Sequence, residues 1–207
     1  ESPPSVAPPP APPQVTRAEV TALATTLKAA RRALGEQDFP QAAAQIAKAE
    51  SLAKLAQHRD AVARLKEVSG YVEYFRNAIA TALGEMQAGE SFTVGTSTEV
   101  AFVEMSKNKV TLHVGGMNRT YDLVELPVGL AMAIADLKLA DSNPVTRVVK
   151  GSYLLVHKRA DAELIDKAKS WWQEAQARGL DMTHLLPFLT DNYDAFVKDV
   201  PAESEKN

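Results

Sequence analysis

Residues 90–127 are the one β-like stretch in a chain whose apolar residues otherwise recur every three or four positions, as in helices. Any fold of this chain must therefore place a small group of strands among helices. Apolar residues occupy every second position from 110 to 114, which is the period of a half-buried β-strand. Further strand-like segments lie at 91–94, 99–105 and 118–123. The pattern predicts a meander of three or four antiparallel strands, curled into an SH3-like half-barrel. A sheet this small needs a helix on its apolar face.

Two short loops set the register of this meander. Residues 107–108 and 115–116 each fit a two-residue hairpin loop, and Asn108 is the residue expected to take a positive φ. The first loop pairs Val103 with Leu112, so that apolar side chains face one another. The sequence therefore predicts that Val103 lies on the core face.

This register has a chemical consequence, because it places Phe102, Glu104 and His113 together on the opposite face of the sheet. A carboxylate and an imidazole beside an aromatic ring can bind a small ligand or exchange protons with a substrate. We therefore consider a ligand-binding or hydrolytic site around Glu104 and His113. The competing interpretation is a face that is solvated or covered by a helix and carries no chemistry.

Composition excludes several kinds of site. The chain has no cysteine, which rules out disulfides, thiol nucleophiles and thiolate metal ligands. Its four histidines lack the close spacing of metal ligands and no cofactor motif is found, so we expect neither a metal nor a cofactor. His58 and His157 fall near predicted helix ends, where a positive charge complements the helix dipole. A net charge of -3 without a basic face argues against a nucleic-acid partner. No apolar run reaches the roughly 18 residues that span a bilayer, so no transmembrane segment is expected.

Residues 1–15 are read as a proline-rich linker, because the first 14 residues hold seven prolines and such tracts favour an extended polyproline II conformation. A PxxP spacing at Pro9 and Pro12 leaves open a second reading, a ligand for an aromatic-lined groove. The chain begins with Glu1 rather than methionine, as it would after removal of a signal peptide or after trimming. We expect an exported protein, periplasmic or extracellular, with a cytoplasmic location as the alternative.

Helical periodicity dominates residues 16–88. Thr16 and Glu19 form a capping box, and Asp38 caps a second helix after a short connection. Two helices joined so closely must lie antiparallel. A long helical segment over 60–87 completes a three-helix N-terminal arm.

The second of these helices resembles the tetratricopeptide repeat family. Phe39, Ala42, Ile46 and Ala49 match the aromatic, small, large and small packing positions of that family. The same spacing recurs at Ile165, Ala168, Trp172 and Ala175. The tryptophan of the first repeat helix and the closing proline are missing, and a solenoid needs about three stacked repeats. The resemblance implies isolated repeat-like hairpins, whose grooves suit peptides or partner helices.

Residues 127–199 are predicted to form a C-terminal four-helix bundle, followed by a charged tail at 200–207. Its helices are expected at 127–137, 144–155, 161–178 and 182–197. Residues 125–130 (ELPVGL) through the segment ending at Ala175 are similar to a C-terminal module of large exported proteins in planctomycete-type bacteria, in which a β-meander precedes a helical hairpin. This resemblance covers roughly residues 88–190. It implies export and no particular chemistry.

These observations predict a mostly helical α+β protein, with the meander at 89–126 between the two helical parts. The function that we expect is a non-enzymatic protein–protein interaction or scaffold module with a protein or peptide partner. Trp171 is a candidate contact residue, because it lies off the buried line of its helix and exposed aromatic residues often mark contacts.

Overall fold

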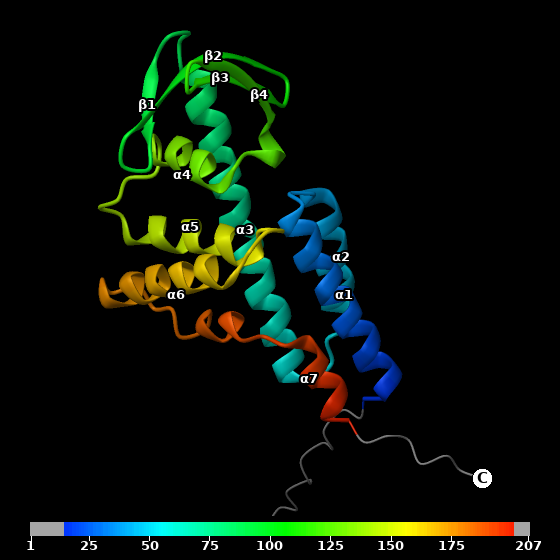
Figure 1. Cartoon of the computed structure of the whole chain (residues 1–207). Helices are drawn as coiled ribbons and strands as arrows, with labels where there is room; N and C mark the ends of the chain where they lie inside the picture. The colour runs from blue at the N-terminus through cyan, green and yellow to red at the C-terminus, as the bar shows by residue number, and fades with distance from the viewer. Residues whose placement is uncertain (1–14, 201–207) are drawn as a thin grey trace, which may run out of the picture.

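A computed structural model describes residues 15–200, so the predicted linker at 1–15 and the tail at 200–207 lie almost wholly outside it. The described residues hold seven α-helices and one four-stranded antiparallel sheet (Figure 1). Helices, counted with the 3-10 turns, account for 61% of the described residues. The predicted fold class, mostly helical α+β, is confirmed.

The molecule is assembled around one long helix, α3 (Ala56–Glu85), whose 30 residues span about 45 Å. It begins at the end of the molecule where the described residues start and stop, and it finishes beneath the sheet (Figure 1). Four helices pack against it: α1 (Arg17–Gly35), α2 (Phe39–Leu52), α4 (Val128–Asp136) and α5 (Pro144–Val156). Its buried side is lined by Leu65, Val68, Val72, Phe75 and Ile79. A single core therefore runs along α3 from one end of the molecule to the other.

The N-terminal hairpin forms where the caps predict it. It consists of α1 (Arg17–Gly35) and α2 (Phe39–Leu52). The Thr16 hydroxyl accepts the Glu19 N–H at 3.2 Å, and the Glu19 carboxylate accepts the Thr16 N–H at 3.1 Å. At its other end, α1 meets α5 very closely, since a β-carbon built on Gly35 would lie 2.3 Å from the Val156 carbonyl oxygen.

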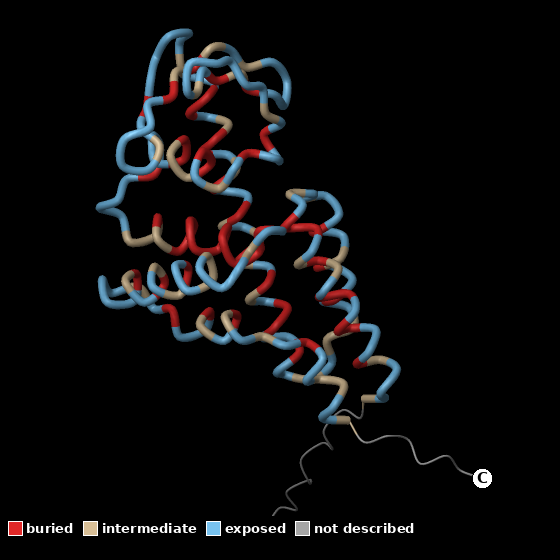
Figure 2. The backbone as a smooth tube through the Cα atoms, viewed as in Figure 1, coloured by how far each residue is buried: buried red, intermediate tan, exposed pale blue. Residues whose placement is uncertain are grey.

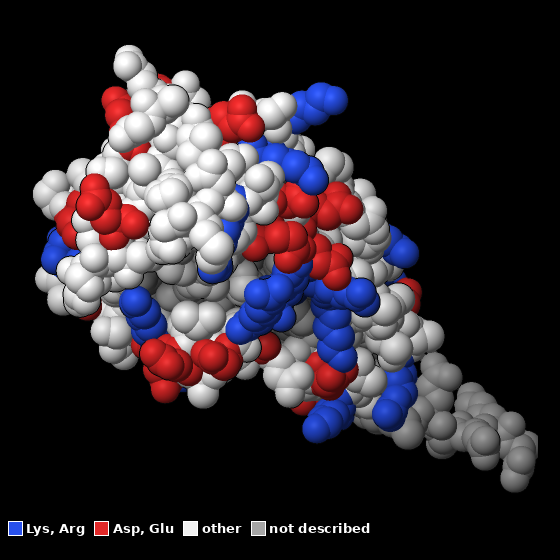
Figure 3. Space-filling view, turned by 45° about the horizontal axis from the view of Figure 1, so that its top comes forward, with Lys and Arg blue, Asp and Glu red and all other residues white. Residues whose placement is uncertain are grey.

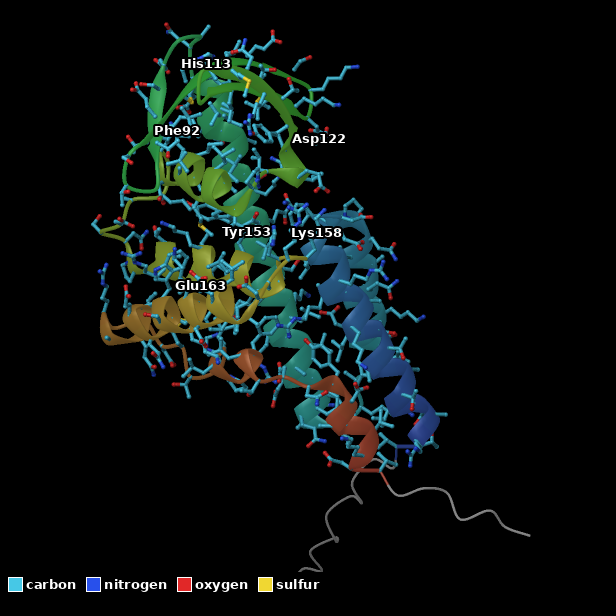
Figure 4. All side chains as sticks on the ribbon, in the orientation of Figure 1. Phe92, His113, Asp122, Tyr153, Lys158 and Glu163 are labelled. Carbon is cyan, nitrogen blue, oxygen red and sulfur yellow. The ribbon has the colours of Figure 1, made fainter. Side chains whose placement is uncertain are left out.

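The first three α-helices after the sheet are α4 (Val128–Asp136), α5 (Pro144–Val156) and α6 (Ala162–Ala177). The Tyr153 ring of α5 stacks on Phe75 of α3, with ring centroids 4.2 Å apart, and Figure 4 shows Tyr153 between these helices. The Trp172 indole N–H donates to the Val148 carbonyl at 3.2 Å. Aromatic side chains thus join α3 to α5 and α5 to α6.

The last helix, predicted at 182–197 with Pro187 bending or ending its first turns, is interrupted in the structure. The segment is divided into η2 (Leu186–Leu189) and α7 (Tyr193–Lys198). Pro187 explains the division, because it has no N–H to donate and its ring excludes a regular preceding turn. Helix α7 then packs on α1, where Lys28 Nζ lies 2.5 Å from Asp194 Oδ1. The end of the described chain therefore joins the N-terminal hairpin.

The sheet is an open meander of β1 (Ser91–Val94), β2 (Thr98–Ser106), β3 (Lys109–Val114) and β4 (Met117–Asp122), in that order. Its inner face covers the end of α3, beside α4, and carries the buried residues of this region (Figure 2). Both predicted two-residue loops are present. In the first, the positive φ falls on Lys107 and not on Asn108.

A β-bulge at Val103 overturns the predicted pairing of Val103 with Leu112. Phe102 pairs with Leu112 and Glu104 pairs with Thr111, which leaves Val103 as an extra residue. Because of this extra residue, the β2 side chains that precede Val103 lie on the face of the sheet opposite to the one predicted. Phe102 consequently joins the core at 6% exposure. Burying a phenyl ring removes more apolar surface from water than burying the shorter Val103 side chain, so the bulge is favoured.

Candidate interaction surface

The bulge separates the three residues that the sequence placed together. Phe102 lies on the inner face against the core, whereas Glu104 and His113 are exposed on the outer face. Figure 4 shows His113 on the side of the sheet away from the helices. The structure thus brings Glu104 and His113 to one face and removes the aromatic ring from it.

Glu104 and His113 lie in separate rows across this face. Glu104 is opposite Thr111, and His113 is opposite Ala101. The His113 ring is bonded instead to Asn118, with Nδ1 2.8 Å from Oδ1. This arrangement does not form the carboxylate–imidazole pair that acid–base catalysis would use.

A hollow of about 530 Å³ occupies the part of the outer face nearest the β2–β3 turn. It is lined by Glu104, Ser106, Lys107, Asn108, Lys109, Thr111, Thr120 and Asp122. The Thr111 and Thr120 hydroxyls lie 3.0 Å apart at its floor, and Lys109 is 3.8 Å from Asp122. Acidic and basic side chains are interspersed over the view in Figure 3. The hollow is therefore polar and of mixed charge, which suits a peptide better than an apolar ligand.

Strand β4 forms an open edge beside this hollow. Among the described residues, β3 is its one strand neighbour, and its residues are exposed apart from half-buried Tyr121. The Leu123 N–H donates to the Asn108 carbonyl at 2.8 Å, so odd-numbered residues of this segment bond toward β3. Because alternate residues of an antiparallel strand bond to opposite sides, the N–H and C=O groups of Asn118, Thr120 and Asp122 point outward.

Few features protect this edge from pairing with another strand. Proteins commonly blunt such edges with proline, lysine, a bulge or a covering helix. Strand β4 carries two charged residues, Arg119 and Asp122, but it contains no proline or lysine and pairs with β3 without a bulge. The other edge, β1, has four residues and packs against α4, where a β-carbon on Gly129 would lie 3.7 Å from Val94. The accessible edge is therefore β4.

Trp171, the second predicted contact residue, is half-buried and surrounded by cations. Arg147, Lys150 and Lys167 lie 5.8, 5.2 and 5.0 Å from its ring centroid. Such cation–π contacts hold the indole in place from within the protein. Lys150 is itself buried and lies 2.5 Å from Asp136. The ring is thus already engaged by its own chain, and its contact with a partner stays a prediction.

Sequence reasoning missed a polar cluster between α3 and the C-terminal segment. Arg64 binds Asp191 through two bonds, of 3.1 and 2.7 Å. Glu67 accepts from Tyr71 at 3.0 Å and lies 2.9 Å from His184 Nε2. Burial, together with the neighbouring Glu67, raises the pKa of Tyr71 to about 12. Partners more than a hundred residues apart leave no local signal in a sequence, and here they fasten the C-terminal segment to α3.

His58 and His157 do not carry the helix-end charges that their positions suggested. Both are buried, and burial lowers the pKa of each below its ordinary value of 6.5. The nearby Arg159 and Lys158 lower the pKa of His157 further. His58 lies in the first turn of α3, where the helix dipole disfavours a cation. Both rings are therefore neutral packing groups near pH 7.

Within residues 15–200, no cluster of three or more histidine, aspartate or glutamate side chains has a metal-binding arrangement. The same part of the chain has no helix that is both long enough and apolar enough to cross a bilayer. No protein-family model, curated protein or solved structure matches this chain significantly. The resemblances to tetratricopeptide repeats and to the exported bacterial module accordingly stay predictions.

Proposed function

We propose that this chain is a non-enzymatic protein-interaction module that adds an extended segment of a partner protein to β4. The observation that carries the proposal is the row of outward N–H and C=O groups on Asn118, Thr120 and Asp122. Strand addition uses such groups for affinity, while alternate side chains of the added strand provide specificity.

The hollow on the outer face supplies a place for those side chains. Every second residue of an added strand would project over the same face as Thr120 and Asp122. Lys109 of β3 and Asp122 of β4 line the hollow next to that row and carry opposite charges. A partner segment with alternating polar residues of both signs would match this surface.

The edge is held rigidly, which favours binding. The neighbouring strand β3 is anchored to the core through Val110 and Leu112, which are fully buried. A strand that is already extended loses little conformational entropy when a partner is added. Export also stays part of the proposal, and the lack of cysteine is compatible with it.

The test uses two substitutions at one position. Thr120→Pro removes one outward N–H, whereas the β3–β4 ladder does not use that N–H. Thr120→Val is the matched control, because it also loses the hydroxyl but keeps the N–H. Both variants should unfold within a few degrees of the unmodified protein.

Binders would be selected from a displayed library of random 12-residue peptides, and affinities measured by fluorescence anisotropy. Losing one backbone hydrogen bond costs about 1 kcal/mol, so Thr120→Pro should weaken binding roughly fivefold to tenfold. Thr120→Val should change it less than about twofold. Amide exchange of Asn118, Thr120 and Asp122 should slow when peptide is bound. The proposal is wrong if no peptide is enriched, or if the enriched peptides bind both variants equally.

A further inference from the structure

We infer that the strand added to β4 is β4 of a second copy of this chain, so that two four-stranded sheets join across a two-fold axis. The inference rests on the proposed function, because it names the partner for the same edge. Its basis is that β4 is complementary to itself when it is turned through 180°.

Symmetry and hydrogen bonding together restrict the register. A two-fold axis requires that if one residue faces another, the reverse pair also occurs. The outward bonding groups belong to Asn118, Thr120 and Asp122, so these residues must face one another. One register meets both conditions over the whole strand: Thr120 faces Thr120 of the second copy, and Asn118 faces Asp122 of the second copy.

The side chains favour this register over its neighbour. Asn118 can donate its amide to the Asp122 carboxylate of the second copy, and symmetry makes this pair twice. On the inner face, Arg119 falls opposite Tyr121 of the second copy, where a cation–π contact can form. Shifting the pairing so that Asn118 faces Thr120 would place Arg119 against Arg119, and like charges directly opposite are destabilising.

The outer face gains a continuous row of hydroxyl groups. Thr111 and Thr120 are already bonded at 3.0 Å within one copy. Placing the two Thr120 residues opposite each other extends this row to four threonines across the interface. Cross-strand threonine pairs of this kind stabilise sheets.

Exposed apolar residues at the two ends of the edge support a second copy in particular. Met117 at the start of β4 is 57% exposed, and Val124 just beyond its end is 38% exposed. They are two of the four large apolar residues exposed among the described residues. The antiparallel pairing brings Met117 of one copy to the Val124 end of the other, at both ends of the interface. The charges of Arg119 and Asp122 cancel within each strand, so the two edges do not repel one another.

Cross-linking provides the sharpest test, because the chain has no cysteine of its own. In the inferred register the two copies of residue 120 have Cα atoms about 5.5 Å apart, which allows a disulfide. Thr120→Cys should therefore give a disulfide-linked dimer on mild oxidation. Asn118→Cys is the control, since its two copies would lie about 13 Å apart along the strands, which is too far.

Sedimentation velocity from about 1 to 500 µM tests the association itself. The unmodified protein should form a dimer, and Thr120→Pro should shift it toward monomer. Asn118→Asp should also weaken the dimer, because its carboxylate would face the Asp122 carboxylate of the second copy. The double variant Asn118→Asp, Asp122→Asn should restore the dimer, because an amide would again face a carboxylate.

Two results would overturn the inference: a protein that stays monomeric throughout this range, or a dimer that forms equally well in the Thr120→Pro variant. If the protein is monomeric but peptides sensitive to Thr120→Pro are selected, the proposed function stands with another partner. If neither the dimer nor such peptides are found, both proposals fail.

Discussion

Replacing Gly35 by alanine tests how closely α1 approaches α5. The φ of Gly35 is not positive, so the backbone itself would accept alanine. The obstacle is the new β-carbon, which would lie 2.3 Å from the Val156 carbonyl oxygen and 3.4 Å from the Lys158 amide nitrogen. Backbone atoms cannot rotate aside as a flexible side chain does. The two helices must therefore separate by about 1 Å to restore an ordinary contact.

The expected cost follows from that separation. A gap of 0.5–1 Å forfeits about a quarter to a half of the dispersion energy between the surfaces involved, and overpacking a core costs about 1–3 kcal/mol. Alanine gains little helix propensity here, because Gly35 is the last residue of α1. We expect Gly35→Ala to lower the free energy of unfolding by about 2–3 kcal/mol. For a chain of this size the melting temperature should fall by about 4–12 °C.

Gly70→Ala is the matched control within the same protein. Gly70 lies in the interior of α3, and apart from its chain neighbours and the nearby backbone of its own helix, nothing described comes within 4 Å of a β-carbon built there. Alanine should raise the free energy of unfolding by about 0.5–1 kcal/mol, because it lowers the backbone entropy of the unfolded chain. Urea unfolding followed by circular dichroism measures both variants. Equal effects from the two substitutions, or stabilisation by Gly35→Ala, would refute the close approach of α1 to α5.

Other substitutions probe the core and its polar ties. Trp172→Ala should cost about 3–5 kcal/mol in urea unfolding, because this ring is fully buried; a loss below about 1 kcal/mol would contradict its place in the core. Arg64→Ala should cost about 2–3 kcal/mol by leaving Asp191 without its partner in a mostly buried site, and Asp191→Asn should recover part of that loss in the double variant. Because burial lowers the pKa of His58 and His157, the unfolded chain binds protons more tightly, so stability should fall as the pH drops below about 6.5. Replacing both histidines by glutamine should flatten that pH dependence in thermal melts, and an unchanged slope would show that other groups cause it.

The helices were predictable because their ends are marked locally. The capping box at Thr16 and Glu19 and the cap at Asp38 bond as the sequence suggests. A cap involves residues two or three positions apart, so a short window of sequence contains the whole interaction. The two-residue loops of the sheet are local in the same way, which is why strand order and the apolar face of β3 could be predicted.

The failures come from interactions that no short window contains. The bulge at Val103 depends on which of two neighbouring side chains finds more room beneath the sheet, and alternation alone cannot decide this. The bulge in turn dispersed the candidate site by moving Phe102 to the core. The bidentate contact between Arg64 and Asp191 joins residues 127 positions apart. Only the folded chain brings such groups together.

The length and direction of α3 determine how far the β4 edge lies from the two ends of the described chain. Helix α1 begins and α7 ends beside the start of α3, while the sheet caps the opposite end (Figure 1). The helix, about 45 Å long, therefore separates the two ends of the described chain from the exposed edge of β4. The first and last described residues, 15 and 200, therefore lie at the end of α3 that is away from that edge. A partner strand added to β4 would likewise lie at the opposite end of α3 from both of these residues.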